Sequence, residues 1–190
     1  MVRSSARRRR RRDARALHGE GAELAREVLE EGELPIAAAV VAGGKIIAEA
    51  TTAERREGRL LVHAELLALD AADRLRPFPG RRRDATLYTN LEPCLMCLGA
   101  AMSCQIGTVC YALESPSDGA VGLASGWRRD EEDFPAYRLP HMVGGVLRRE
   151  SAALFSRYVE IHDGGPVWEW ARSLALLGRR DRPSGQADGA

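Results

Sequence analysis

The chain has 190 residues, 45% of them hydrophobic and 29% charged, a size and balance that suit one globular domain with a sizeable core. Its longest apolar run, residues 36–42, is far too short to cross a bilayer, and no apolar export segment follows the basic start of the chain. We therefore expect a cytoplasmic protein whose four cysteines serve a metal or catalytic purpose and not a disulfide framework.

Charge is distributed unevenly along the chain. Seven of the 28 basic residues lie in the first twelve positions, so from Asp13 onward 21 basic residues face 27 acidic ones, a balance of −6. A domain that follows a long phosphate backbone usually has the opposite sign, so this balance favours a small substrate. Residues 1–13 and 179–190 are expected to be disordered tails, and residues 14–178 the folded domain.

Hydrophobic periodicity and turn signals predict helices that alternate with strands after an initial hairpin. This order implies an α/β fold, a three-layer α/β/α sandwich around a mixed sheet of about five strands. The predicted elements are a helix at 16–31, strands at 36–41 and 45–50 joined by a glycine turn, a helix at 63–76, a strand at 85–90, a helix at 94–105, strands at 108–112 and 142–147, and a helix at 148–160.

Aromatic residues gather in two later segments. A long irregular stretch, residues 118–140, contains Trp127, Phe134 and Tyr137, which either stack on a base or pack in the ordinary way. Trp168 and Trp170 are expected to dock a terminal helix.

Two short motifs each open a predicted helix, His63-x-Glu65 and Pro93-Cys94-x-x-Cys97. Each motif alone is weak, because a Cys-x-x-Cys is also a redox pair and a His-x-Glu is common at a solvated helix start. Together they supply one imidazole and two thiolates, which suit zinc and leave one tetrahedral position open for water. Cysteines at i and i+3 in a first helical turn face the same way, so one metal can bind both. We predict one Zn²⁺ per chain, held by His63, Cys94 and Cys97.

Glu65 lies two residues beyond His63, so it points away from the ligand position and is free to face the open site. Zinc brings the pKa of a bound water from about 15.7 toward about 7, which makes hydroxide available at neutral pH. Glu65 is expected to take the proton of that water, pass it to a ring nitrogen and help ammonia leave. The predicted activity is therefore hydrolytic deamination of a ring carbon, with a carbonyl as the product.

The two motifs together resemble the cytidine/deoxycytidylate deaminase superfamily. Residues 91–100 (LEPCLMCLGA) and 34–36 (LPI) are similar to the branch that contains tRNA adenosine deaminases and bacterial guanine deaminases, and the resemblance covers roughly residues 17–160. It implies a cytidine deaminase-like fold, a homodimer, and a zinc-dependent deaminase domain at residues 14–178. It also implies a base pocket lined by Ile36 and by the backbone at Ala64, and Pro93 is a further candidate substrate-binding residue.

One departure from that branch concerns the substrate. The relatives place an asparagine in the loop before the His-x-Glu helix, where its amide bonds to the purine edge, whereas this chain has Thr51-Thr52-Ala53 there. The only asparagine is Asn90, three residues before Pro93 at the end of a predicted strand. Asn90 either supplies the missing amide as a substrate-binding residue or closes a turn.

Three functions follow from these observations. The first is deamination of a small-molecule nucleobase or nucleoside, with a purine or purine-like ring, and it is favoured by the acidic charge after Asp13. The second is tRNA-specific adenosine deamination, in which the base is flipped into the pocket. The third, of another class, is a non-catalytic zinc-stabilised module that binds RNA through its Arg-rich arm. Such a module would not need Glu65 and would usually close its zinc site with a fourth protein ligand.

Overall fold

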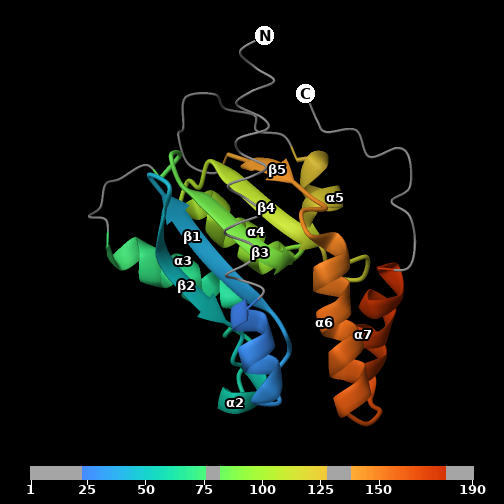
Figure 1. Cartoon of the computed structure of the whole chain (residues 1–190). Helices are drawn as coiled ribbons and strands as arrows, with labels where there is room; N and C mark the ends of the chain where they lie inside the picture. Colours follow the sequence, from blue (N-terminus) through green and yellow to red (C-terminus); the bar gives the residue numbers. More distant parts are fainter. Residues whose placement is uncertain (1–22, 76–81, 128–137, 179–190) are drawn as a thin grey trace.

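Five strands form one mixed sheet in the order β2-β1-β3-β4-β5 (Figure 1). β1 pairs antiparallel with both β2 and β3, whereas β3, β4 and β5 run parallel to one another. This computed structural model describes residues 23–75, 82–127 and 138–178. The arrangement confirms the predicted α/β fold with its mixed sheet. The strands are β1 (Ala37–Ala42), β2 (Lys45–Thr51), β3 (Thr86–Leu91), β4 (Thr108–Leu113) and β5 (His141–Val143).

The hairpin between β1 and β2 turns on two glycines. Ala42 pairs with Lys45, which leaves Gly43 and Gly44 as the two-residue loop between the strands. Their φ angles are 59° and 75°, both in the left-handed region that a type I′ hairpin turn requires. Glycine adopts this region without steric cost, so the predicted glycine turn is confirmed.

Helices pack on both faces of the sheet. Ala37 and Ala38 are neighbours in β1 and therefore point to opposite faces. Ala38 belongs to the main hydrophobic cluster with Ala68 of α3, whereas Ala37 packs in a separate cluster with Ala25 and Leu154. Ala25 lies in a helix at residues 23–30, and Leu154 lies in α6. The helices are α2 (Glu54–Glu57), α3 (Ala64–Arg74), α4 (Leu95–Ser103), α5 (Val121–Ser125), α6 (Arg148–Ile161) and α7 (Pro166–Leu177).

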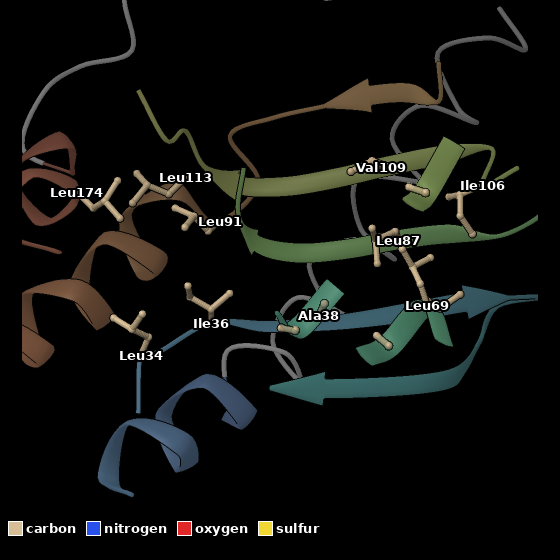
Figure 2. Close-up of a cluster of buried hydrophobic side chains, with 14 of the residues drawn as sticks. Leu34, Ile36, Ala38, Leu69, Leu87, Leu91, Ile106, Val109, Leu113 and Leu174 are labelled. Atoms are coloured by element: carbon tan, nitrogen blue, oxygen red, sulfur yellow. The ribbon is translucent and has the colours of Figure 1, made fainter. Parts of the chain in front are cut away.

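The main hydrophobic cluster runs along the sheet to the C-terminal ends of β3 and β4 (Figure 2). Leu87 and Val109 are the second residues of β3 and β4, and Leu69 of α3 belongs to the same cluster and lies close to Leu87 in the picture. At the other end, Leu113 lies beside Leu174 of α7. α6 and α7 pack side by side at that end, so the C-terminal helix reaches the strand ends where the two zinc motifs follow (Figure 1).

Some predicted boundaries differ from those of the structure. The last strand was expected at residues 142–147 but spans only His141–Val143, because Gly145 and Leu147 have φ angles of 81° and 58° that end the extended backbone. No local pattern predicted the short helices α2 and α5, whereas the terminal helix expected from Trp168 and Trp170 is α7. The predicted tails, the first seven residues of the first helix, and Phe134 and Tyr137 lie outside the described residues.

Within the described ranges, no helix combines the length and the apolar character that a membrane span requires.

Candidate metal and active site

His63, Cys94 and Cys97 converge at the start of two helices. His63 is the N-cap of α3, Cys94 is the N-cap of α4, and Cys97 lies in the first turn of α4. The Nδ1 atom of His63 is 3.7 Å from Sγ of Cys94 and 3.5 Å from Sγ of Cys97, and all three donor atoms lie within 4.8 Å of one another. Among the described residues these three form the group that could hold a metal ion.

The spacing of the donor atoms fits zinc. Zinc–nitrogen bonds of about 2.0–2.1 Å and zinc–sulfur bonds of about 2.3 Å, at a tetrahedral angle, would place nitrogen and sulfur about 3.6 Å apart. The two separations of 3.7 and 3.5 Å match that value. One borderline nitrogen and two soft sulfurs are also the donor types that zinc prefers. The predicted ligand residues are therefore placed to bind zinc with three protein ligands.

The protonation states of these groups depend on one another. The pKa of Cys94 is lowered to about 4, mainly by the neighbouring Cys97 side chain, and His63 adds to the effect. The pKa of His63 is raised to about 10, first by Cys94 and then by Glu54. The pKa of Cys97 is raised, first by the neighbouring Cys94 sulfur and then by burial. Metal binding requires neutral imidazole and thiolates, so it releases protons from this cluster.

Glu65 is a buried carboxyl group beside the ligand cluster. It is 4% exposed, and its side chain forms part of the wall of the main cavity. Thr89 Oγ1 donates to Oε1 at 3.2 Å, and the Cys97 thiol donates to Oε2 at 3.5 Å. Burial raises the pKa of Glu65, because a charged carboxylate is poorly solvated there. A carboxyl group with a raised pKa exchanges protons more readily near neutral pH than an exposed glutamate does.

A cavity of about 370 Å³ opens over the ligand cluster. This volume lies within the range of small-molecule sites. None of the residues that line it in the described chain is an arginine or a lysine. Its apolar walls come from the residues before β1, from the end of β3 and from α7, and its acidic side chains come from four separate elements. The lining residues are Leu34, Ile36, Thr52, Glu54, His63, Ala64, Glu65, Leu91, Glu92, Cys94, Asp118, Pro166, Val167 and Trp170.

Two of the four candidate substrate-binding residues line this cavity, and two do not. Ile36, just before β1, and Ala64, the first residue of α3, belong to the lining. Pro93 is fully buried behind the site, and its carbonyl accepts from the backbone N–H of Ala120. Asn90 is also buried and is not among the lining residues that the structure describes.

The amide of Asn90 bonds to the backbone on both sides of Ile36. Its Oδ1 accepts from the N–H of Ala37 at 2.8 Å, and its Nδ2 donates to the carbonyl of Pro35 at 2.8 Å. Ser151 of α6 donates to the Asn90 carbonyl. Asn90 therefore fixes the backbone that presents Ile36 to the cavity, and a contact of Asn90 with the substrate stays a prediction.

Nine of the fourteen lining residues were not predicted as site residues, and five of these nine carry a polar group or an aromatic ring. Thr52 and Glu54 follow β2 where the relatives have their asparagine, so the loop comparison already located this position. Asp118 lies in the loop after β4, and Ser115 and Ser117 both donate to its Oδ1. Trp170 was assigned only to docking a helix, and no local pattern placed it at the cavity.

The loop that carries Asp118 is held by Glu92. Its Oε2 accepts from the N–H of Ser115 and its Oε1 from the N–H of Val121, both at 3.0 Å. Trp170 is fixed from two sides, since its Nε1 donates to Ser117 Oγ at 3.1 Å and its ring packs edge-on against Phe155. These contacts hold the far wall of the cavity in place.

Within the described ranges, the other cysteines, the other histidines and Trp127 are not among the residues that line the cavity. Cys104 caps the far end of α4 and Cys110 is buried in β4, so neither joins the ligand cluster. His141 is exposed, and His162 stacks on Tyr158. Trp127 is 40% exposed and is not among the lining residues of the described chain.

The chain is similar to known proteins over most of its length. Residues 12–113 match the family described as cytidine and deoxycytidylate deaminase zinc-binding region. The chain is 34% identical to the tRNA-specific adenosine deaminase of Bacillus subtilis over 137 residues, which cover 70% of this chain and 81% of that enzyme. It is 38% identical over 151 residues to the tRNA(Ile)-lysidine synthase of Deinococcus radiodurans, covering 72% of this chain but only 25% of that protein.

A solved structure of guanine deaminase from Nitrosomonas europaea shares the fold. Its TM-score with this chain is 0.58 and its sequence is 28% identical, over 74% of this chain and 81% of that chain. The family match over residues 12–113 includes β1 to β4 and the two helices whose N-termini hold the cluster.

Proposed function

Because the chain belongs to the zinc-binding cytidine and deoxycytidylate deaminase family, whose members hydrolyse C–N bonds, we propose that it deaminates a free nucleobase or nucleoside. The ring is a purine or purine-like, and the products are a carbonyl and ammonia. One observation supports this proposal above the others. The buried carboxyl of Glu65 lies against the Cys97 thiol and lines the cavity, so a proton carrier faces the metal ligands and the substrate space together.

In this proposal His63, Cys94 and Cys97 hold the zinc ion. When bound, the ion supplies a Lewis acid that lowers the pKa of a coordinated water. The ligand residues do the rest through position, because α4 begins at Cys94 and its first turn presents both sulfurs on one side. The N-terminus of that helix also stabilises negative charge on the thiolates.

Glu65 moves the protons of the reaction. Its carboxylate accepts the proton of the attacking water and returns it to the ring nitrogen next to the carbon under attack. The carboxylate then takes the proton of the new C–OH group and gives it to the departing amine, so that ammonia leaves as the carbonyl forms. Thr89 holds the carboxyl in place through Oε1, and burial keeps its pKa high enough for the protonated form to be accessible. The base lies between Ile36 and the backbone at Ala64.

The charge of the cavity supports a substrate without phosphate. Glu54, Glu92 and Asp118 line it together with Glu65, and among the described residues the one basic side chain in the lining is His63, a predicted zinc ligand. A phosphate group near several carboxylates would be repelled, and no arginine or lysine there could compensate for its lost hydration. A free base or nucleoside has no such charge and instead offers N–H donors to carboxylates.

The flat shape of a base suits the remaining walls. Ile36 and Leu34 supply an apolar surface before β1, and Trp170 supplies an aromatic side chain from α7. An aromatic ring and branched aliphatic side chains favour a planar heterocycle, because stacking uses the faces of the ring and leaves its polar edge free. A purine or purine-like ring satisfies this description.

Deamination of adenosine in tRNA is the second candidate function. It is favoured by the similarity to a tRNA-specific adenosine deaminase over 81% of that enzyme. It would require the acidic cavity to accept a flipped base while the adjacent phosphates bind outside it.

The substrate can be identified by measuring ammonia release from a panel of bases, nucleosides, nucleoside 5′-monophosphates and a tRNA anticodon stem-loop. We expect turnover of a base or nucleoside that is insensitive to salt, and slower turnover of the matching monophosphate. If only the stem-loop were deaminated, with a steep dependence on salt, tRNA editing would replace the small-molecule function.

We propose in addition that the protein is a homodimer. Leu60 and Leu61, shortly before His63, and Leu95, immediately after Cys94, are 81%, 63% and 65% exposed. Large apolar side chains that are exposed in one chain, next in sequence to two ligand residues, are typical of a surface that a second chain covers. Light scattering of the purified protein measures the mass directly, and a monomer would refute this assembly.

A further inference from the structure

The two ring nitrogens of His63 face different partners. Nδ1 lies 3.5–3.7 Å from the two cysteine sulfurs, whereas Nε2 lies 3.5 Å from Oε1 of Glu54. The ring of a histidine at an N-cap lies outside the helical turns, so the helix itself does not select its orientation. A separate contact is therefore needed to keep Nδ1 toward the sulfurs.

Glu54 is placed to make that contact and not to bind the metal itself. Its carboxylate lies on the Nε2 side of the ring, and it is absent from the group of donor atoms that could share one ion among the described residues. A carboxylate that accepts from Nε2–H leaves the Nδ1 lone pair free, which selects the tautomer that a metal on Nδ1 requires.

The segment that carries Glu54 is itself fixed by the fold. Oε2 of Glu54 accepts from Thr52 Oγ1 at 3.1 Å, so the carboxylate is held on both of its oxygens. The short helix α2 is tied by Glu33, a buried carboxylate whose Oε2 accepts from the N–H groups of Arg55 and Arg56, both at 3.0 Å. An anion at these N–H groups stabilises the start of α2.

The backbone before α2 gives a second anchor. The N–H of Ala53 donates to the carbonyl of Val62 at 3.1 Å, which joins the residue before Glu54 to the residue before His63. Thr52 Oγ1 is also 3.3 Å from the same carbonyl. The distance between the Glu54 carboxylate and the His63 ring is thus set by a closed loop of backbone contacts and not by two freely rotating side chains.

We propose that Glu54 is a positioning residue that orients the His63 imidazole and keeps its proton on Nε2, so that Nδ1 faces the metal. The inference rests on the proposed zinc ligands and is independent of the substrate. Removal of a residue that hydrogen-bonds to a metal-ligating histidine typically lowers metal affinity by roughly 10–100-fold. Glu54 also lines the cavity, but its effect on the metal does not require any substrate to be bound.

The test compares zinc affinity in the full-length protein with Glu54→Ala, Glu54→Gln and the control Glu57→Gln. Glu57 lies on the same short helix and pairs with the exposed Arg59. Zinc dissociation constants come from competition with a chromophoric chelator, and the absorption of the cobalt-substituted protein reports the ligand geometry. Circular dichroism of the metal-free variants checks that each one folds.

We expect Glu54→Ala to weaken zinc binding roughly 10–100-fold and to alter the cobalt spectrum. Glu54→Gln should lose less, because its amide oxygen can still accept from Nε2–H, and Glu57→Gln should bind zinc as the wild type does. Unchanged affinity in Glu54→Ala would overturn the proposal, and if the alanine variant fails to fold, unchanged affinity in Glu54→Leu, which also lacks an acceptor, would do so. An equal loss in Glu57→Gln would also overturn it. Retention of zinc by a Cys94→Ala variant would instead show that the proposed ligands are wrong.

Discussion

Glu65→Gln is the substitution that isolates proton transfer. Glutamine keeps the volume of the side chain, and its amide oxygen can still accept from Thr89 Oγ1, 3.2 Å away in the wild type. Alanine would leave a void and an unpaired buried hydroxyl, which costs about 1–3 kcal/mol of stability. The glutamine variant therefore keeps the fold and the zinc while it loses the group that carries the proton.

The expected loss of activity is large. General acid–base catalysis by a positioned side chain contributes roughly 10²- to 10⁴-fold, which corresponds to about 3–5 kcal/mol of transition-state stabilisation. Among the described residues, Glu65 is the buried carboxyl group that both contacts a ligand sulfur and lines the cavity, whereas Glu54 faces the Nε2 side of His63. We expect kcat to fall by at least about 100-fold, with a smaller change in KM.

In the metal-free protein, Glu65→Gln should gain stability relative to the wild type, although it loses activity. Burial raises the pKa of Glu65 above its usual value of 4.5, so the neutral carboxyl contributes stability that is complete below pH 4.5. That contribution is lost as the pH rises through the folded-state pKa, by at most about 1.4 kcal/mol per pH unit. Glutamine cannot ionise. The free energy of unfolding of Glu65→Gln should therefore increasingly exceed that of the wild type as the pH rises above 4.5.

Three measurements check these statements. Ammonia release gives kcat and KM, elemental analysis gives zinc content, and urea unfolding of the metal-free proteins at several pH values gives the stability difference. A variant with full zinc and turnover within tenfold of the wild type would refute the role of Glu65. A stability difference that stayed constant with pH would refute the assignment of a raised pKa to this carboxyl.

Three other predictions follow from the site. The double variant Cys94→Ala, Cys97→Ala should lose zinc, since only the imidazole of His63 remains, and full occupancy by elemental analysis would refute the ligand set. Asn90→Ala should lower the free energy of unfolding by about 1–3 kcal/mol, because it leaves the backbone beside Ile36 unpaired. The same substitution should raise KM more than it lowers kcat. Urea unfolding measures the first effect and steady-state kinetics the second. Deletion of residues 1–12 should leave turnover unchanged at all salt concentrations, because no arginine or lysine of the described chain lines the cavity, and an inactive truncated protein would argue for RNA binding.

Local sequence patterns were sufficient for the metal cluster. The first-turn spacing of Cys94 and Cys97 determines that their sulfurs share one side of a helix, whatever the rest of the fold does. The same reasoning applies to the hairpin, since Gly43 and Gly44 adopt the positive φ angles of the turn without help from distant residues. Such features depend on backbone geometry over a few residues, and a sequence therefore predicts them well.

The other side chains around the cluster could not be assigned in this way. Asn90 was singled out as the only asparagine near the motif, yet its amide bonds to Pro35 and Ala37, more than fifty residues earlier in the chain. Its neighbour in the sequence is the metal motif, but its partner in space is the start of β1. The pairing of β1 with β3 decides which way the amide points.

The far wall of the cavity was decided by tertiary structure alone. The periodicity of residues 166–177 indicates a helix, but nothing local says that Trp170 faces the cavity and bonds to Ser117. The same holds for Glu54, which meets His63 only because Glu33 and Val62 anchor its helix. Secondary structure and ligand spacing are local properties of the chain. The walls of a site depend on which distant apolar faces are buried together, and that choice minimises the exposed apolar area of the whole domain.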